Sequence, residues 1–168
     1  MISYGKQSVN TEDMQAVLSC MESDYLTQGA IHLEFEQEIS LLCEGSYATS
    51  CNSGTSALHI ACMVLGLSQG DWLWTSANSF VASANCGRYC GAQVDFVDID
   101  ISTGLMSVDC LSEKLRRAKE ENKLPKILVA VHYAGQSCDM EAISILAREY
   151  NFKVIEDACH AFGGFYQG

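Results

Sequence analysis

Basic residues are scarce in this sequence of 168 residues. Lysine and arginine total 10 against 21 aspartates and glutamates, which gives a formal charge of -11 at neutral pH. A nucleic-acid backbone or an anionic membrane surface is recognised by a basic face, so neither is expected as a partner. Apolar runs that approach the ~20 residues of a membrane span are also missing.

Several ligand-binding motifs are absent as well. There is no Gly-x-x-x-x-Gly-Lys-Ser/Thr and no Gly-x-Gly-x-x-Gly, so a nucleoside triphosphate site or a Rossmann dinucleotide site has no support. No Cys-x-x-Cys pair occurs, and the nine cysteines are scattered and odd in number. We expect free thiols, buried or half-buried, in a reducing compartment, and no metal site.

The N-terminus, Met-Ile-Ser-Tyr-Gly-Lys, has the features of neither a signal peptide nor a transit peptide. We therefore expect a cytoplasmic protein. The composition, 48% hydrophobic and 18% charged, suffices for a sizeable core and argues against intrinsic disorder.

Apolar runs and helical patterns alternate along the chain. Two helices are expected first, one starting at a cap at Thr11 and one at Phe35–Cys43. Strands are then expected at Tyr47–Ser50, Trp72–Thr75, Val94–Val97, Ile127–Val131 and Val154–Ile155. Helices are expected between them at Thr55–Leu65, Ser79–Cys90, Val108–Asn122 and Met140–Tyr150. Four repeats of strand, helix and strand predict an α/β fold with three layers, a mainly parallel sheet with helices on both faces.

Ligands of such sheets gather at the carboxyl ends of the strands. In this sequence those ends are residues 51–56, 76–80, 98–100, 132–136 and 156–160. Most of the uncommon chemistry of the chain lies in these five segments.

The turn Asn52-Ser-Gly-Thr-Ser-Ala57 joins a predicted strand to a predicted helix. Gly54 permits a tight turn, and the N–H groups and hydroxyls of Thr55 and Ser56 would form a phosphate cup at the positive helix terminus. The alternative is a plain helix cap, because serine and threonine favour such positions anyway.

The predicted strand Val154–Ile155 leads into two acids, Glu156 and Asp157. An aspartate there could anchor a protonated ring nitrogen, since a carboxylate beside a cation favours the charged form. The alternative is a capping or solvated aspartate. His160 could reach the same ligand or be structural, and Phe80 is either a stacking plate or part of the core.

The strand ends occur in the order found in a known family. The chain resembles the sugar aminotransferases of the DegT/DnrJ/EryC1/StrS family, fold-type I enzymes that use pyridoxal phosphate. Within that family it is most similar to the pseudaminic-acid branch, through Tyr133-Ala-Gly-Gln136 and His160. The matching stretches are Tyr4–Gln7, Tyr25–Gly29, Phe35–Glu36, Asn52–Leu58, Ser79–Asn85, Gly91–Ala92, Val94–Asp100, Val131–Gln136 and Glu156–Ala161.

The resemblance implies a role for each matching cofactor-site position. Gly54, Thr55 and Ser56 would hold the cofactor phosphate, and Phe80 would stack on the pyridine ring. Asp157 would pair with the ring nitrogen and keep it protonated. His160 would lie near the phenolic oxygen of the ring. The residues on the nucleotide-sugar side would be Tyr4, Asp24, Tyr25, Leu26, Thr27 and again Gly54.

The resemblance also implies what this chain lacks. Family members are much longer, and their Schiff-base lysine follows the Asp157 motif, whereas all six lysines here precede it. We therefore expect residues 1–30 to form an N-terminal arm and substrate-side segment, and residues 31–168 a partial large domain without the C-terminal small domain. Such a fragment would contain no catalytic lysine and would be inactive alone.

The implied reaction of the full-length homodimer is amino transfer from glutamate to C4 of a UDP-linked 4-keto-6-deoxy-N-acetylhexosamine. The alternative is a noncatalytic α/β binding or interaction module that retains the scaffold.

Overall fold

The computed structural model describes residues 6–167, and it divides the chain into two compact units. One unit ends at Ser50 and the other begins at Cys51. This division differs from the functional boundary that the sequence places after Ala30, which stays a prediction. None of the helices in the described part is both long and apolar enough to cross a membrane.

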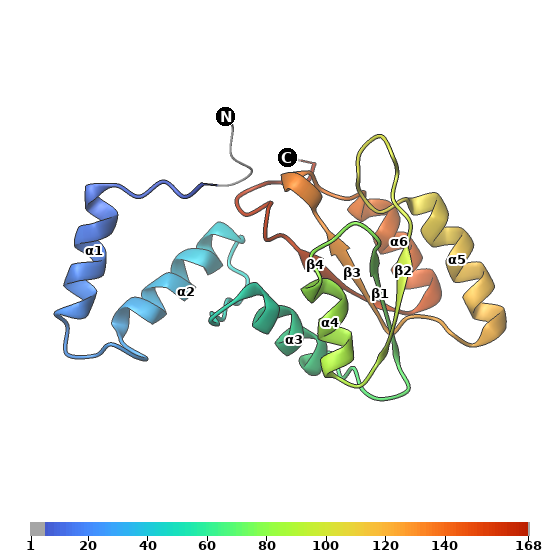
Figure 1. Cartoon of the computed structure of the whole chain (residues 1–168), viewed down its shortest axis with the longest axis horizontal. Helices are drawn as coiled ribbons and strands as arrows, with labels where there is room; N and C mark the ends of the chain where they lie inside the picture. The colour runs from blue at the N-terminus through green and yellow to red at the C-terminus, as the bar shows by residue number, and fades with distance from the viewer. Residues whose placement is uncertain (1–5, 168) are drawn as a thin grey trace. The chain divides into compact units, whose positions relative to one another are not determined.

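The first unit contains two helices, α1 (Thr11–Met21) and α2 (Ala30–Leu42) (Figure 1). The cap of α1 is Asn10 rather than Thr11: the Asn10 side chain accepts from the Asp13 N–H, and the Asp13 carboxylate accepts from the Asn10 N–H. α2 begins five residues before the expected Phe35, because Gly29 supplies the extended residue that precedes it.

The strand expected at Tyr47–Ser50 does not form. A strand needs a neighbour to accept and donate its backbone hydrogen bonds, and no strand of the described residues pairs with this segment. The Ser50 N–H donates instead to the Glu36 carboxylate of α2 at 2.7 Å, and Tyr47 is fully exposed. The apolar pattern was right for a strand, but the pairing partner is missing.

The second unit is a parallel sheet of four strands in the order β2-β1-β3-β4 (Figure 1). Its α/β class and parallel arrangement confirm the prediction, although it has three βαβ crossovers rather than four. The strands are β1 (Trp72–Ser76), β2 (Gln93–Val97), β3 (Ile127–Val131) and β4 (Lys153–Asp157). The helices are α3 (Gly54–Val64), α4 (Ala82–Tyr89), α5 (Val108–Glu121) and α6 (Met140–Tyr150), with a 3-10 turn, η1 (Tyr133–Gly135), after β3.

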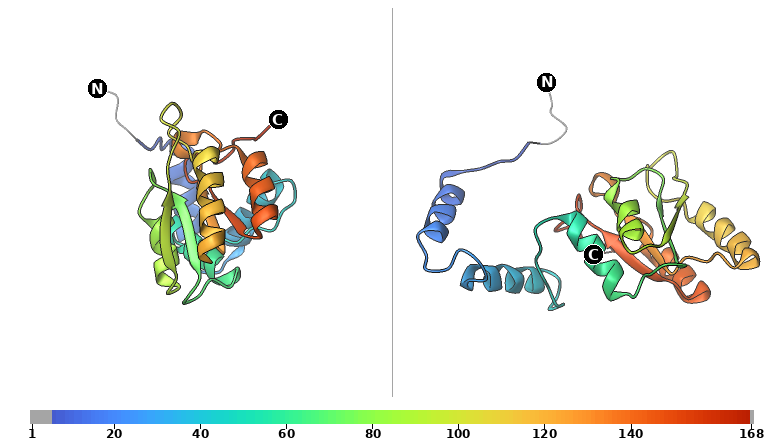
Figure 2. Two further views of the ribbon diagram at one scale, coloured as in Figure 1. Left: turned by 90° about the vertical axis from the view of Figure 1, so that its right-hand side faces the viewer. Right: turned by 60° about the horizontal axis from the view of Figure 1, so that its bottom comes forward.

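Helices lie on both faces of this sheet (Figure 2), and a hydrophobic core fills the space between helices and sheet on each face. Trp74 and Leu128 point into the core under α5 and α6, which also contains Leu111 and Ile143. The alternate strand residues, with Leu73 among them, form the second core with residues of α3 and α4. All five residues of β3 are buried, as expected for a central parallel strand.

The cysteines follow the prediction only in part. Those in the two cores are buried, but three lie on loops or helix ends and are exposed, where no apolar partner covers them. Buried are Cys62, Cys86 and Cys138, half-buried are Cys20, Cys90 and Cys110, and exposed are Cys43, Cys51 and Cys159.

Candidate functional site

The loops at the carboxyl end of the sheet pack directly on one another. A β-carbon added at Gly104, after β2, would lie 3.4 Å from the ring of Tyr133, after β3. One added at Gly135 would lie 2.9 Å from the carbonyl oxygen of His160, after β4. Both glycines have positive φ, +74° and +86°, so glycine is required here for conformation and for close approach. Three of the predicted strand ends therefore form one edge.

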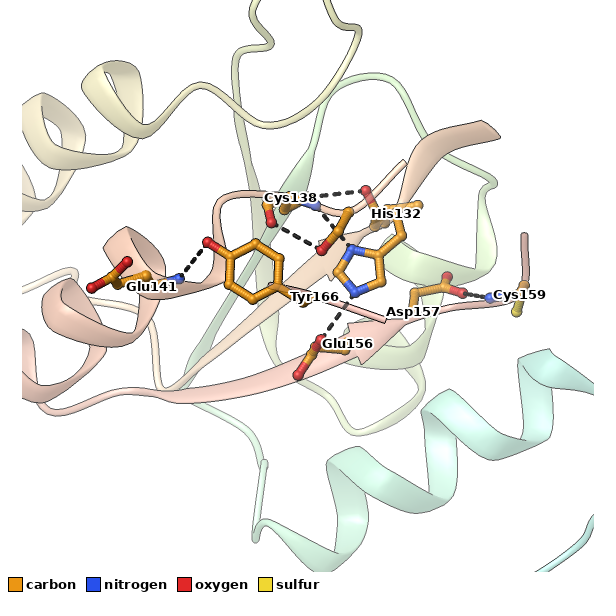
Figure 3. A network of polar contacts seen from close by, with 9 residues as sticks. His132, Cys138, Glu141, Glu156, Asp157, Cys159 and Tyr166 are labelled. Atoms are coloured by element: carbon orange, nitrogen blue, oxygen red, sulfur yellow. Dashed lines mark hydrogen bonds and ion pairs between the residues drawn. The ribbon is translucent and has the colours of Figure 1, made fainter. Parts of the chain in front are cut away.

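Asp157, the last residue of β4, is the buried acid of this edge, with an exposed fraction of 7%. Its Oδ2 accepts a hydrogen bond from the Ser83 hydroxyl at 3.0 Å, and its Oδ1 accepts one from the Cys159 N–H at 3.3 Å (Figure 3 shows the latter). In the part of the chain that the structure describes, this carboxylate forms no ion pair. A buried carboxylate with two neutral donors and no cation fits a positively charged ring nitrogen.

Ser83 was not among the predicted site residues. It lies in the first turn of α4, is fully buried, and accepts a hydrogen bond from the Ser79 hydroxyl at 2.8 Å. The i, i+4 spacing of the two serines was visible in the sequence. The contact of Ser83 with Asp157, 74 residues away, was not, because it depends on how α4 packs on the sheet.

The turn before α3 shows the helix cap that the sequence allowed. Ser53 is the N-cap, and its Oγ accepts from the Ser56 N–H at 3.2 Å. The Ser56 hydroxyl donates to Asn52 Oδ1 at 2.7 Å. The predicted phosphate cup of Gly54, Thr55 and Ser56 thus begins a capped helix, whose positive end suits an anion. Phosphate binding at these residues stays a prediction.

This turn lies beside the loop that follows Asp157. A β-carbon added at Gly54 would lie 3.1 Å from the Cys159 sulfur. The predicted phosphate end and ring-nitrogen end of the site are therefore neighbours. The adjacent Asp157 carboxylate raises the pKa of the Cys159 thiol to about 11, chiefly because it accepts a hydrogen bond from the protonated thiol; partial burial and the repulsion between two negative charges add to the effect.

Phe80 and His160 belong to different loops at the carboxyl end of the sheet. Phe80 stands between β1 and α4 and is 71% exposed, so it is not part of the core. The His160 ring lies edge-on to the Tyr133 ring, with the centroids 6.5 Å apart and the planes at 61°. Neither the stacking role of Phe80 nor the ligand role of His160 is tested by these contacts.

His132 forms a second buried network beside Asp157 (Figure 3). It is 5% exposed, and its Nδ1 accepts the Cys138 N–H at 3.2 Å. The ring proton of a neutral His132 must then lie on Nε2, which faces the Glu156 carboxylate at 3.0 Å. These bonds fasten the loop after β3 to β4.

The predicted substrate-side residues other than Gly54 do not belong to the second unit. Tyr4 lies outside the described residues. Asp24, Tyr25, Leu26 and Thr27 belong to the unit that ends at Ser50, in an exposed turn after α1. Their role stays a prediction.

The lysines of the second unit lie away from Asp157. Lys126 pairs with Asp71 before β1, and Lys153 starts β4, so both mark the amino end of the sheet. Lys114 on α5 pairs with Asp95 at 2.6 Å. Lys119 lies in the last turn of the same helix and Lys123 follows that helix. Within residues 51–167, then, no lysine stands at the strand ends that carry the candidate site.

Comparison of the sequence with known proteins identifies the family of the chain. The model of the DegT/DnrJ/EryC1/StrS aminotransferase family matches residues 7–168. The chain belongs to this family. Membership indicates pyridoxal phosphate as the cofactor.

Individual members of the family resemble the chain over almost all of its length. GDP-perosamine synthase of Caulobacter vibrioides is 34% identical over 99% of the chain, which covers 44% of that enzyme. UDP-4-amino-4-deoxy-L-arabinose--oxoglutarate aminotransferase of Shewanella sediminis is 34% identical over 97% of the chain and 40% of that protein. The chain spans less than half the length of these relatives.

A solved structure agrees with the fold. PseC of Helicobacter pylori, an aminotransferase involved in the biosynthesis of pseudoaminic acid, superposes with a TM-score of 0.88 and 30% identity. The match covers 99% of this chain and 43% of that one.

Proposed function

We propose that the chain is the cofactor-binding part of a nucleotide-sugar aminotransferase that uses pyridoxal phosphate. The observation that carries the proposal is Asp157: a buried carboxylate, held by two neutral donors, with no cation beside it in the described residues. Burying an uncompensated charge is costly, so it is retained where a ligand supplies the opposite charge.

Each residue of the edge has a distinct task in this proposal. Bound pyridoxal phosphate supplies an electron-accepting ring. Asp157 holds a proton on the ring nitrogen, and Phe80, exposed without ligand, covers one ring face and keeps water from it. Thr55 and Ser56 bind the phosphate at the positive end of α3. His160 lies near the phenolic oxygen.

The substrate is a finer proposal. We take it to be a UDP-linked 4-keto-6-deoxy-N-acetylhexosamine, aminated at C4 with glutamate as donor by a cytoplasmic homodimer. The likeness to PseC supports this sugar, while the likeness to GDP-perosamine synthase makes a GDP-linked sugar the competing result. Residues 1–30 would serve the sugar side and residues 31–168 the cofactor side.

The catalytic lysine is proposed to lie outside this sequence. The positions of Lys114, Lys126 and Lys153 support this, because none is at the edge that holds Asp157. The purified chain should therefore not aminate the keto sugar. Borohydride reduction with pyridoxal phosphate should label no unique lysine, as read by mass spectrometry.

Cofactor binding by the chain itself tests the proposal. Pyridoxal phosphate is titrated by calorimetry, and saturable binding is expected. Asp157→Ala should weaken it about tenfold or more, since bonds to charged groups contribute about 1.5–3 kcal/mol. Thr55→Ala should weaken it less. Asp98→Ala is the matched control, because Asp98 follows β2, the edge strand on the other side of the sheet from β4, and is exposed.

The outcomes separate the two functions considered. Binding that is lost in Asp157→Ala and kept in Asp98→Ala supports the cofactor role. Failure to bind at millimolar concentrations would favour the noncatalytic module. Titration with UDP-linked and GDP-linked sugars then discriminates between the nucleotides.

A further inference from the structure

A line of hydroxyl groups ends on the buried carboxylate of the site. The Ser79 hydroxyl donates to Ser83 Oγ at 2.8 Å, and its other possible acceptor, the Phe80 carbonyl oxygen, lies farther away at 3.3 Å. The Ser83 hydroxyl donates to Asp157 Oδ2 at 3.0 Å. A serine has one proton to donate. Because Ser83 gives its proton to the carboxylate, its oxygen is free to accept from Ser79, so the direction of the line is fixed.

The Ser83 bond is not an ordinary feature of a helical serine. A serine near the start of a helix commonly bonds to a neighbouring backbone group. Ser83 reaches a side chain 74 residues away instead. Nor does burial alone provide a serine with a partner here: Ser76, at the end of β1, is 2% exposed, and its Oγ has no hydrogen-bond partner in the described structure.

We propose that Ser83 is the residue that positions Asp157 for the ring nitrogen, with Ser79 supporting it. This inference rests on the proposed function. Ser83 fixes the rotation of the carboxylate from the Oδ2 side, while the Cys159 N–H fixes it from the Oδ1 side. Each oxygen keeps lone pairs for a ligand. Ser83 touches neither substrate nor cofactor and acts only through Asp157.

If Ser83 positions Asp157, it controls how strongly the site prefers a ligand with a ring nitrogen, and not affinity alone. A merely structural Ser83 would affect every ligand of the site alike. A positioning Ser83 affects only the part of the binding that passes through the ring nitrogen. The probe is therefore a pair of ligands: pyridoxal phosphate and its 1-deaza analogue, in which a CH group replaces the ring nitrogen. The measured quantity is the ratio of their two dissociation constants for the 168-residue chain.

Four single variants and one double variant then locate the effect. Ser83→Ala should reduce the preference for pyridoxal phosphate about 3- to 10-fold, and Ser79→Ala should reduce it less. Ser76→Ala makes the same chemical change at a similarly buried serine without a partner and should leave the ratio unchanged. Asp157→Asn should abolish the preference, and adding Ser83→Ala to it should change the ratio no further. Thermal unfolding of each variant checks that it is folded.

Each result has one meaning. If the unsubstituted chain binds both ligands equally, the pairing of Asp157 with the ring nitrogen fails, and this inference fails with it. If the chain prefers pyridoxal phosphate and the Ser83 and Ser79 variants keep the full preference, the inference is wrong while the proposed function stands. Should Ser83→Ala not fold, the half-buried Ser79→Ala decides.

Discussion

Two substitutions at His132 separate the two hydrogen bonds of this buried ring. Its Nδ1 accepts the Cys138 N–H at 3.2 Å, and its Nε2 faces Glu156 at 3.0 Å. The amide oxygen of an asparagine lies close to the position of Nδ1, whereas a glutamine amide reaches the position of Nε2. His132→Asn therefore keeps an acceptor for Cys138, and His132→Gln keeps a partner for Glu156.

The burial of the two partners decides which loss is larger. Cys138 is fully buried, so its N–H has no water to bond when the acceptor is removed, which costs about 1–3 kcal/mol. The Glu156 side chain is 55% exposed and returns to water, so losing its contact costs about 0–1 kcal/mol. Packing opposes this order, because asparagine is shorter than glutamine by one methylene, or about 0.8 kcal/mol. His132→Gln should still lower the free energy of unfolding by about 1 kcal/mol more than His132→Asn.

Urea unfolding at one fixed pH, followed by circular dichroism, measures both free energies and the slope m. Glu156→Ala is the control and should cost no more than about 1 kcal/mol. If His132→Asn proves as destabilising as His132→Gln, or more so, the buried Cys138 amide is not the dominant partner and the reasoning is refuted.

Three further predictions concern acid stability, thiol reactivity and the core. The hydrogen bond from Lys126 lowers the pKa of Asp71, so the pair stabilises the fold at neutral pH and loses this contribution as the pH falls below about 4; Asp71→Asn should cost under about 1 kcal/mol and flatten the acid limb in urea titrations. Because Asp157 raises the pKa of Cys159 to about 11, its thiolate is about 100-fold scarcer than that of an ordinary cysteine, so iodoacetamide should alkylate it slowly and Asp157→Asn should accelerate the reaction in mass spectrometry. Leu111→Ala leaves a cavity at a fully buried position of α5 and should lower the free energy of unfolding by about 2–5 kcal/mol in urea, and a smaller loss would show that the core relaxes around it.

The sequence predicted those elements whose pattern and surroundings agree. β3 (Ile127–Val131) has the predicted bounds, because five consecutive apolar residues fit a strand that is buried on both faces. α6 (Met140–Tyr150) also has its predicted bounds, and Asn151 ends it in the left-handed region. Tyr47–Ser50 carries a similar short apolar pattern but has no strand beside it in the described residues. A local pattern indicates that a segment can form a strand, and pairing with a neighbouring strand decides whether it does.

The candidate site was visible in the sequence only in part. Asp157 was proposed because an acid after an apolar strand is visible in the sequence, and the structure shows that it is buried; its role stays a prediction. Ser83 was missed because its partner depends on tertiary packing across 74 residues. His132 was seen as part of a strand end, but its two partners come from a loop and from the next strand, so no spacing in the sequence indicated them.

The position of α4 explains how Ser83 reaches Asp157. β1 and β4 are not neighbours, because β3 lies between them, so Ser83 on the helix after β1 must reach across a strand to meet Asp157. The helix can do so only if it lies close to the sheet. Gly87 allows this approach: a β-carbon there would come within 3.0 Å of Leu73 and 3.1 Å of Val94, so a larger residue would crowd these two side chains. Gly87 thus lets α4 lie close enough to the sheet for the Ser83 hydroxyl, one turn earlier, to hold the Asp157 carboxylate.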